Sequence, residues 1–273
     1  MLISDAEMRR EHGSYLRNVR FGAARQGSLA TCSFCGAPVD GYEFCIACSR
    51  SVEIVRSAGL APPVDGVSFL TYAVELGGPG EAISERQRGA GRQAYRTLQQ
   101  YKRPTFNREG LKSVAEWTAW WLERGPVKPG ASIDPNLVWA MPSSRRSGRE
   151  GEHPLERVVS AVIPRSVPRI EVSAREGHLG RGLDLEAYEV SKDLSGRKVL
   201  LVDDTWATGS TVLSAGAALK AAGASAVYAM VLGRALNSAW EPTRRFIEMG
   251  GLSAPFDMKP LWSRWPGGGA VKR

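Results

Sequence analysis

The stretch 198–222 constrains the fold of this chain more than any other, because it runs from a strand through an acidic pair into a helix. Its apolar residues 199–202 have the length and branching of a buried strand. Asp203 and Asp204 follow, then a short loop rich in hydroxyl residues, then a helical pattern that Gly223 closes. This order predicts an anion site at a helix N-terminus with two carboxylates beside it.

The two halves of this stretch together suit a phosphorylated sugar. Neighbouring carboxylates accept charge-assisted hydrogen bonds from the vicinal hydroxyls of a ribose. The peptide N–H groups and the dipole at the helix start attract a phosphate, and Gly209 permits a positive φ there. The acidic pair could instead bind a divalent metal or be solvated; a receiver-type phosphorylation site would not explain the helix start. The candidate catalytic residues are Asp203 and Asp204, and the candidate 5′-phosphate-binding residues are Ala207, Thr208, Gly209, Ser210 and Thr211.

All four cysteines of the chain lie close together near the N-terminus, as Cys32, Cys35, Cys45 and Cys48. Two C-x-x-C pairs at this spacing suit a tetrahedral zinc ion, with each pair on its own turn. Two disulfides are the alternative, which a cytoplasmic chain disfavours. Four protein ligands leave no open coordination position, so we predict a structural zinc site rather than a catalytic one.

Strands and helices alternate along the rest of the chain, which predicts a doubly wound α/β parallel sheet with a small N-terminal zinc-ribbon module. Ligands of such sheets bind at the carboxyl ends of the strands. The acidic pair and the Ser/Arg-rich loop 143–149 both follow predicted strands and occupy such ends. We expect strands at 67–76, 136–141 (as the first strand of the parallel sheet), 169–172 and 225–232, and helices at 108–123 and 153–162.

The helix 108–123 carries an apolar stripe that has two interpretations. Its members fall on one helical face, and the tryptophans among them could form a platform for stacking bases. Helical spacing is more typical of core residues, which we therefore favour. The stripe consists of Leu111, Val114, Trp117, Trp120 and Trp121.

Composition shifts suggest four parts: a partly ordered lead-in (1–30), the zinc ribbon (31–62), the main domain (63–250) and a loosely ordered tail (251–273). No apolar run approaches about 20 residues, so we expect no membrane span, and the polar N-terminus does not resemble a secretory signal. Cytoplasmic location is the default. The net charge of +8 has two interpretations, a soluble protein with a basic tail or a protein with an anionic ligand, which is a phosphorylated metabolite or nucleic acid. Charge alone does not choose between them. An oligomer is equally open.

The segment 202–211, VDDTWATGST, resembles the PRPP-binding signature of type I phosphoribosyltransferases. With the four cysteines, Tyr101-Lys102 and a strand closing on Pro142, the chain resembles the ComF-like, competence-associated family of these enzymes. The resemblance implies Mg²⁺-dependent transfer of ribose 5-phosphate from PRPP to a nitrogen acceptor such as a nucleobase, with release of pyrophosphate. It also implies that the loop after the first strand binds the pyrophosphate. The matching positions are Ser143, Ser144, Arg145 and Arg146.

The chain departs from the family pattern in places that matter for catalysis. The run 149–153 matches only partly, and Asp184 stands where the later family pattern has Asn, between Arg181 and Ala187-Tyr188. Ala207 replaces an acid found in some purine-specific relatives, so a general base would have to come from elsewhere, with Glu176 or Glu186 as candidates. A second hypothesis therefore stays open: a PRPP- or nucleotide-sensing or DNA-uptake accessory protein without transferase activity.

Overall fold

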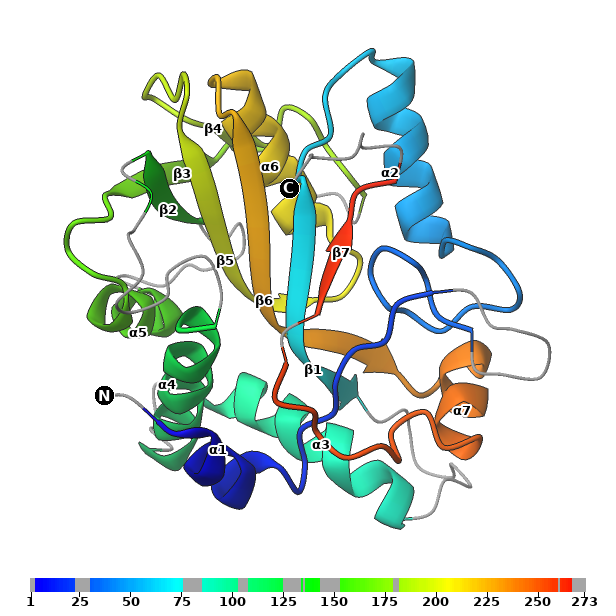
Figure 1. Cartoon of the computed structure of the whole chain (residues 1–273). Coiled ribbons are helices and arrows are strands. Elements are labelled where there is room, and N and C mark those ends of the chain that lie inside the picture. The colour runs from blue at the N-terminus through cyan, green and yellow to red at the C-terminus, as the bar shows by residue number, and fades with distance from the viewer. Residues whose placement is uncertain are drawn as a thin grey trace.

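A computed structural model of the chain describes residues 3–22, 30–75, 85–102, 108–124, 134, 136–142, 153–178, 182–259 and 261–266. Within these ranges a seven-stranded sheet has the order β4-β3-β2-β5-β6-β1-β7 (Figure 1). The strands are β1 (Gly66–Glu75), β2 (Leu137–Pro142), β3 (Arg169–Ala174), β4 (Tyr188–Glu189), β5 (Lys198–Trp206), β6 (Ala226–Asn237) and β7 (Trp262–Arg264). The helices are α1 (Asp5–His12), α2 (Ile46–Ser57), α3 (Glu85–Gln100), α4 (Arg108–Leu122), α5 (Pro154–Val162), α6 (Ser210–Ala221) and α7 (Glu241–Glu248).

The five central strands are parallel, and the short strands β4 and β7 add antiparallel pairs at the two edges. This confirms the predicted α/β sheet. One expectation was wrong: β2 is not the first strand of the parallel sheet, because β1 precedes it in the sequence and pairs with β6. All but the last residue of β1 are buried. A parallel strand that is covered on both faces has a nearly continuous apolar sequence. Such a sequence indicates burial but does not indicate which strands lie beside it.

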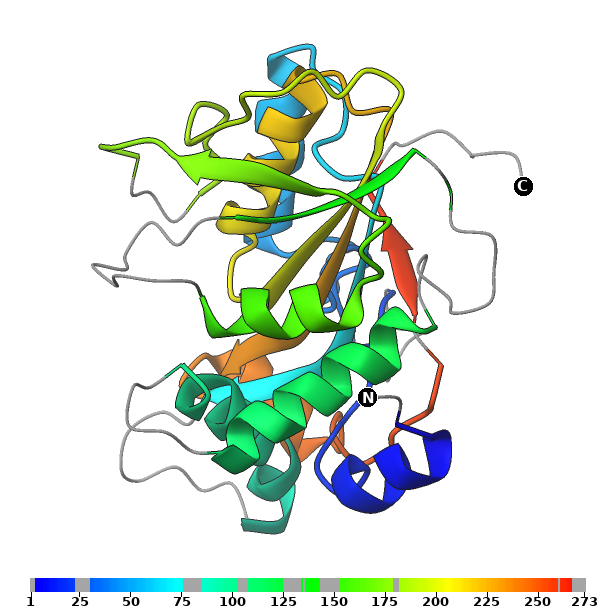
Figure 2. The ribbon, with the colours of Figure 1, turned by 90° about the vertical axis from the view of Figure 1, so that its left-hand side faces the viewer.

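Helices cover both faces of the sheet, as Figure 2 shows with the sheet nearly edge-on. One apolar core lies beneath α2, α6 and α7 and includes the cysteines; the other lies beneath α1, α3, α4 and α5. The second core contains the stripe of α4, whose three tryptophans are each at most 1% exposed. The core interpretation of that stripe is confirmed, and these rings present no surface for bases.

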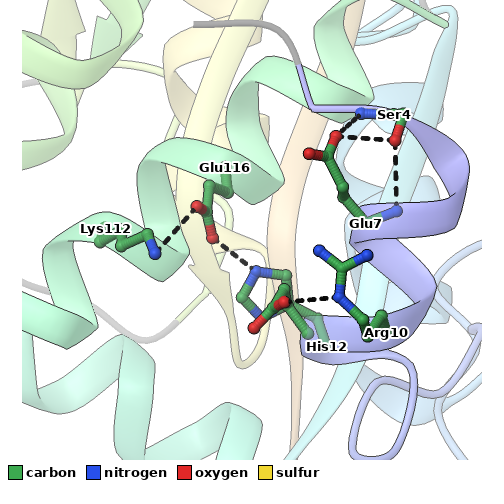
Figure 3. A network of polar contacts seen from close by, with 7 residues as sticks. Ser4, Glu7, Arg10, His12, Lys112 and Glu116 are labelled. Atoms are coloured by element: carbon green, nitrogen blue, oxygen red, sulfur yellow. Dashed lines mark hydrogen bonds and ion pairs between the residues drawn. The ribbon is translucent and has the colours of Figure 1, made fainter.

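The N-terminal segment is tied to α4 by polar contacts (Figure 3). Ser4 caps α1 by accepting a hydrogen bond from the backbone N–H of Glu7, whose carboxylate accepts one from the backbone N–H of Ser4. At the other end of α1, the buried Nε2 atom of His12 lies 2.8 Å from Oε2 of Glu116. Lys112 lies 3.6 Å from the second carboxylate oxygen. The described part of the lead-in is thus packed onto the domain.

The C-terminal residues also differ from expectation where they are described. We expected a loose tail, but β7 pairs antiparallel with β1, and Trp265 is buried with its ring centroid 5.1 Å from that of Phe34. Ser263 Oγ donates to the carbonyl oxygen of Phe34 at 2.5 Å. Pairing satisfies backbone groups of β1 that an edge strand would leave open. Among the described helices, none has the length and apolarity that a membrane crossing requires.

Candidate functional site

The acidic pair lies within a strand rather than after it. We expected the strand to end at Val202 and a loop to begin at Thr205, but β5 continues to Trp206. The longer β6 supplies the reason, because it pairs with β5 at Asp203↔Val231 and at Thr205↔Gly233. The carboxylates therefore sit on rigid backbone near the carboxyl end of the strand, where doubly wound sheets bind ligands.

Asp204 is buried and engaged by three groups from distant segments. The Tyr101 hydroxyl donates to its Oδ2 atom. The Lys102 Nζ atom lies 2.8 Å from Oδ1 and 2.7 Å from Oδ2, and His153 Nε2 lies 3.8 Å from Oδ2. Burial alone would raise the pKa of Asp204, but Lys102 and the Tyr101 hydrogen bond outweigh it and lower this pKa below its usual value. Asp204 is therefore an ionised acceptor at neutral pH.

Asp203 has the opposite electrostatic character. Its pKa is raised to about 7, first by burial and then by the negative charge of Asp204. Its Oδ1 atom accepts a hydrogen bond from the backbone N–H of Asp204 at 2.8 Å. Near neutral pH the pair thus offers an ionised carboxylate, Asp204, and a partly protonated carboxyl group, Asp203. Such a pair can both accept hydrogen bonds from a diol and donate one to it.

The loop 207–209 leads directly into α6. Gly209 is the N-cap with φ +86°, and its carbonyl accepts the first helical hydrogen bond from Leu213 at 2.9 Å. The first N–H groups of a helix lack partners within the helix and point outward at its start. Thr208 and Ser210 hydroxyls lie 3.3 Å apart beside them. We call these N–H and hydroxyl groups the anion cradle, because donors at the start of a helix are of the kind that suits an anion.

Replacing Gly209 by alanine should deform this cradle. A Cβ atom there would lie 2.2 Å from Cζ2 of the buried Trp206, at a φ that side chains rarely adopt. Strain and overpacking together should cost about 2–5 kcal/mol of stability, which thermal unfolding would measure. Gly196→Ala is the control, because Gly196 has φ +74° but open space around it. Equal losses in the two variants would contradict the steric argument.

Several sequence-predicted residues lie outside the described ranges: Ser143, Ser144, Arg145, Arg146, the run 149–152 and Arg181. Asp184 is described; its Oδ2 atom lies 2.7 Å from His178 Nδ1, and its backbone N–H donates to Ser214 Oγ of α6 at 3.0 Å. This places the segment around Asp184 against α6. Glu176 and Glu186 are exposed, and in the described part of the chain no contact joins either to the acidic pair.

A cavity of about 600 Å³ opens beside the loop. It shares Ala207 and Thr208 with the anion cradle and extends along the end of β6 to α2 and the start of α7. Trp240, 44% exposed, and Ile46, 66% exposed, present apolar surface there, and Asn237 adds an amide. A volume of this size lies in the usual range for small-molecule sites, about 300–1,000 Å³.

The four cysteines come together as predicted, with all their sulfur atoms within 4.8 Å of one another and all buried. They form no disulfide, and the Cys35 and Cys45 sulfurs are 3.6 Å apart. Sulfurs bound to one tetrahedral zinc at about 2.3 Å lie roughly 3.8 Å apart, so the set fits a metal ion. The Cys35 N–H lies 3.4 Å from the Cys32 sulfur, and Cys45 is the N-cap of α2.

Sequence reasoning assigned no role to three groups that contact Asp204. Tyr101 and Lys102 follow α3, about a hundred residues before Asp204, and His153 is the N-cap of α5. The signal in the sequence was the place of Tyr101-Lys102 in the family resemblance, which named the pair without giving it a role. Because this pair lies about a hundred residues before Asp204, no local pattern indicated the contact between them.

Part of the chain that includes these residues is similar to a known family of domains. A family model described as "Phosphoribosyl transferase domain" matches residues 149–247, which include Asp203, Asp204, the loop and α6. The matched region is less than half of the chain and shows what this part of the chain is similar to. Comparison with curated proteins gave no match.

Several solved structures resemble parts of the chain. Phosphoribosylpyrophosphate synthetase from Mycobacterium smegmatis has 17% identity and a TM-score of 0.30, over 48% of this chain and 36% of that one. Hypoxanthine phosphoribosyltransferase from Staphylococcus aureus has 13% identity and a TM-score of 0.33, over 50% and 71%. Orotate phosphoribosyltransferase from Mycobacterium tuberculosis H37Rv has 22% identity and a TM-score of 0.31, over 56% and 74%. Likenesses this low carry no functional argument.

Proposed function

We propose that the protein binds PRPP and transfers its ribose 5-phosphate to a nitrogen acceptor, a nucleobase in the first instance, with release of pyrophosphate. The observation that supports this most is the position of the acidic pair directly before a glycine-capped helix, inside the region that matches the phosphoribosyl transferase domain. A ribose 5-phosphate uses both the carboxylates and the anion cradle, whereas a simple anion would use only the second.

In this proposal each segment has a distinct task. Asp203 and Asp204 bind the 2′- and 3′-hydroxyls, and residues 207–211 bind the 5′-phosphate. Ser143, Ser144, Arg145 and Arg146 bind the pyrophosphate, for which their hydroxyl and guanidinium donors are suited. Lys102 keeps Asp204 ionised, so the hydrogen bond to the sugar stays charge-assisted.

The reaction would be a displacement at ribose C1′ with an oxocarbenium-like transition state. The protein then acts mainly by positioning the groups and by balancing charge. Mg²⁺, bound chiefly by PRPP oxygens and water, would neutralise the leaving pyrophosphate. The carboxylates and hydroxyls at the end of β5 are hard oxygen ligands of the kind that suit Mg²⁺.

The test is pyrophosphate release from PRPP in the presence of a panel of nucleobases, alongside direct measurement of PRPP binding. Release that depends on one base supports the transferase. PRPP binding without release with any base would contradict transfer and favour the sensing or DNA-uptake accessory role. Absence of PRPP binding would contradict both. Salt-dependent binding of single-stranded DNA tests the nucleic-acid part of the second role.

The cavity at the end of β6 is our proposed acceptor site. It adjoins the loop that would bind the 5′-phosphate, and its mixture of Trp240, Ile46 and the Asn237 amide suits a flat heterocycle. An aromatic ring provides stacking, and the amide provides hydrogen bonds to a base edge.

Truncating Trp240 should therefore weaken acceptor binding selectively. Loss of a stacking ring costs about 1–3 kcal/mol per base, so we expect Trp240→Ala to raise the acceptor KM roughly ten- to a hundredfold. The Kd for PRPP should stay within about twofold, because Trp240 does not line the anion cradle. Tyr42→Ala, at an aromatic residue 71% exposed outside the cavity, is the matched control. An unchanged acceptor KM in Trp240→Ala would refute the cavity assignment.

We also propose that the metal at the four cysteines is zinc with a structural role. Buried thiolate sulfurs in a set of four are the ligands that structural zinc sites use. When bound, the ion would hold the segment 31–62 in shape against the sheet.

A further inference from the structure

Arg234 of β6 connects the four-cysteine cluster to the loop before α6. Its side chain is buried, with 5% exposure. On one side, Nε donates to the carbonyl oxygen of Cys35 at 2.9 Å, and Nη2 lies 3.5 Å from the Cys35 sulfur. On the other side, Nη1 donates to the carbonyl oxygens of Trp206 and Ala207, each at 3.0 Å. One guanidinium thus contacts Cys35 of the cluster, Trp206 at the end of β5 and Ala207 at the start of the loop.

The chemistry of a filled cluster explains why a buried arginine is placed there. Four thiolates around one divalent ion leave two negative charges in excess. Buried charges are costly unless they are paired, and a guanidinium remains protonated and donates in fixed directions. Metal binding keeps the thiolates deprotonated. A metal-bound cluster therefore holds Arg234 in this orientation through charge as well as hydrogen bonding.

The orientation of Arg234 determines the direction in which the peptide groups at the start of the loop point. In a trans peptide the C=O and the following N–H point in opposite directions. Because the carbonyls of Trp206 and Ala207 point at Arg234, the N–H groups of Ala207 and Thr208 point away from it. These are two of the donors that we propose for the 5′-phosphate. The buried ring of Trp206 packs edge-on against Phe34 and Phe69, and this packing also restrains the peptide between Trp206 and Ala207.

We propose that Arg234 is a positioning residue that couples metal occupancy of the cluster to anion binding at the loop. The inference rests on the proposed PRPP site. It states that the bound metal orients the loop N–H groups and so tightens PRPP binding. Because binding linkage is reciprocal, PRPP must raise the equilibrium affinity of the cluster for the metal by the same factor. The four cysteines then tune the ligand site in addition to supporting the fold.

The experiment measures the equilibrium affinity of the full chain for zinc by competition with a chromogenic chelator, with and without saturating PRPP. In the unmodified protein PRPP should raise the zinc affinity at least fivefold. Arg234→Lys keeps the charge but loses the bidentate fork, and it should reduce this gain in zinc affinity to less than twofold and weaken PRPP binding about tenfold. Arg245→Lys is the control, because Arg245 also reaches the cysteine-bearing segment, through Asp40 at 3.2 Å, without touching the loop. It should behave like the unmodified protein.

A second measurement needs neither a variant nor a nucleotide. Amide hydrogen exchange of the peptide 203–213 should quicken at least fivefold when the metal is chelated, while exchange in α4 stays unchanged. If PRPP binds the unmodified protein yet leaves the zinc affinity unaltered, the coupling is wrong and the proposed function stands. If PRPP does not bind but loop exchange depends on metal, the proposed function is wrong and the coupling of cluster to loop stands. If amide hydrogen exchange of the loop does not change when the metal is chelated, the coupling is wrong in either case.

Discussion

A chain that carries both Asp203→Asn and Asp204→Asn is expected to lose PRPP binding while it keeps its fold. Each carboxylate that accepts a hydrogen bond from the sugar contributes about 1.5–3 kcal/mol. Loss of both should raise the Kd roughly a hundredfold to ten-thousandfold. Asparagine has a similar shape and can still accept from Tyr101 and Lys102, so the packing around position 204 is preserved. Isothermal titration calorimetry with PRPP measures the effect, and circular dichroism monitors the fold.

The sign of the charge change makes this test stringent. The double variant removes the charge of Asp204 and part of the charge of Asp203, whose pKa is about 7, next to a highly anionic ligand. Relief of Coulomb repulsion alone should therefore tighten binding. The matched control is Asp193→Asn with Asp257→Asn, which removes at least as much negative charge from two exposed positions away from the acidic pair. We expect this control to bind PRPP as well as the unmodified chain or slightly better. Equal affinity in the two double variants would refute the diol assignment.

Replacing Cys35 by serine is expected to remove the metal and to unfold the surrounding segment. Structural zinc sites contribute their binding free energy directly to folding. Cys35 is 1% exposed, belongs to the same apolar core as β1, β5 and β6, and contacts Arg234. A loss of about 4 kcal/mol would lower the Tm of a chain of this size by roughly 10 °C. Metal analysis should give about one zinc per unmodified chain and far less in the variant.

A neighbouring substitution separates ligand loss from general disturbance of the turn. Ser33→Ala changes a residue of the same turn that is not a ligand. Within the described ranges its hydrogen bond is made by the backbone N–H, which donates to the carbonyl oxygen of Glu43 at 2.9 Å. We expect its metal content to stay near one ion per chain and its Tm to shift by less than about 2 °C. Full zinc content in Cys35→Ser would show that the metal does not depend on this thiolate.

The sequence was informative where the chemistry is local. The strand, acidic pair, loop and helix of 198–222 are contiguous, and the cysteines lie within 17 residues of one another, so spacing alone predicted both groups. The helical stripe of α4 likewise predicted its own burial. In each case the pattern repeats at the period of one element or follows one turn, and a single stretch of chain contains all the necessary information.

What sequence reasoning missed depends on long-range pairing. The extension of β5 past Asp204 is set by β6, which runs five residues beyond the predicted end. Lys102 reaches Asp204 across 102 residues, and Arg234 reaches Cys35 across 199. An arginine inside the buried run VLGRAL was the available signal for the second contact, because a charge in such a run needs a buried partner. No local pattern identifies that partner.

The three-residue strand β7 has a consequence for the protein in concentrated solution. Strand β1 is ten residues long, with nine of them buried, and β7 pairs with its first three, Gly66–Ser68. Further along, the N-terminal segment contacts β1, because the backbone N–H of Tyr72 donates to the carbonyl oxygen of Arg17 at 2.8 Å. A long apolar strand with free backbone groups is a template onto which a second chain can add. The short cover, with the buried Trp265 as its anchor, therefore blocks the start of that template. The described residues near both ends of the chain thus cover an edge onto which a second copy could otherwise add, a consequence separate from ligand binding.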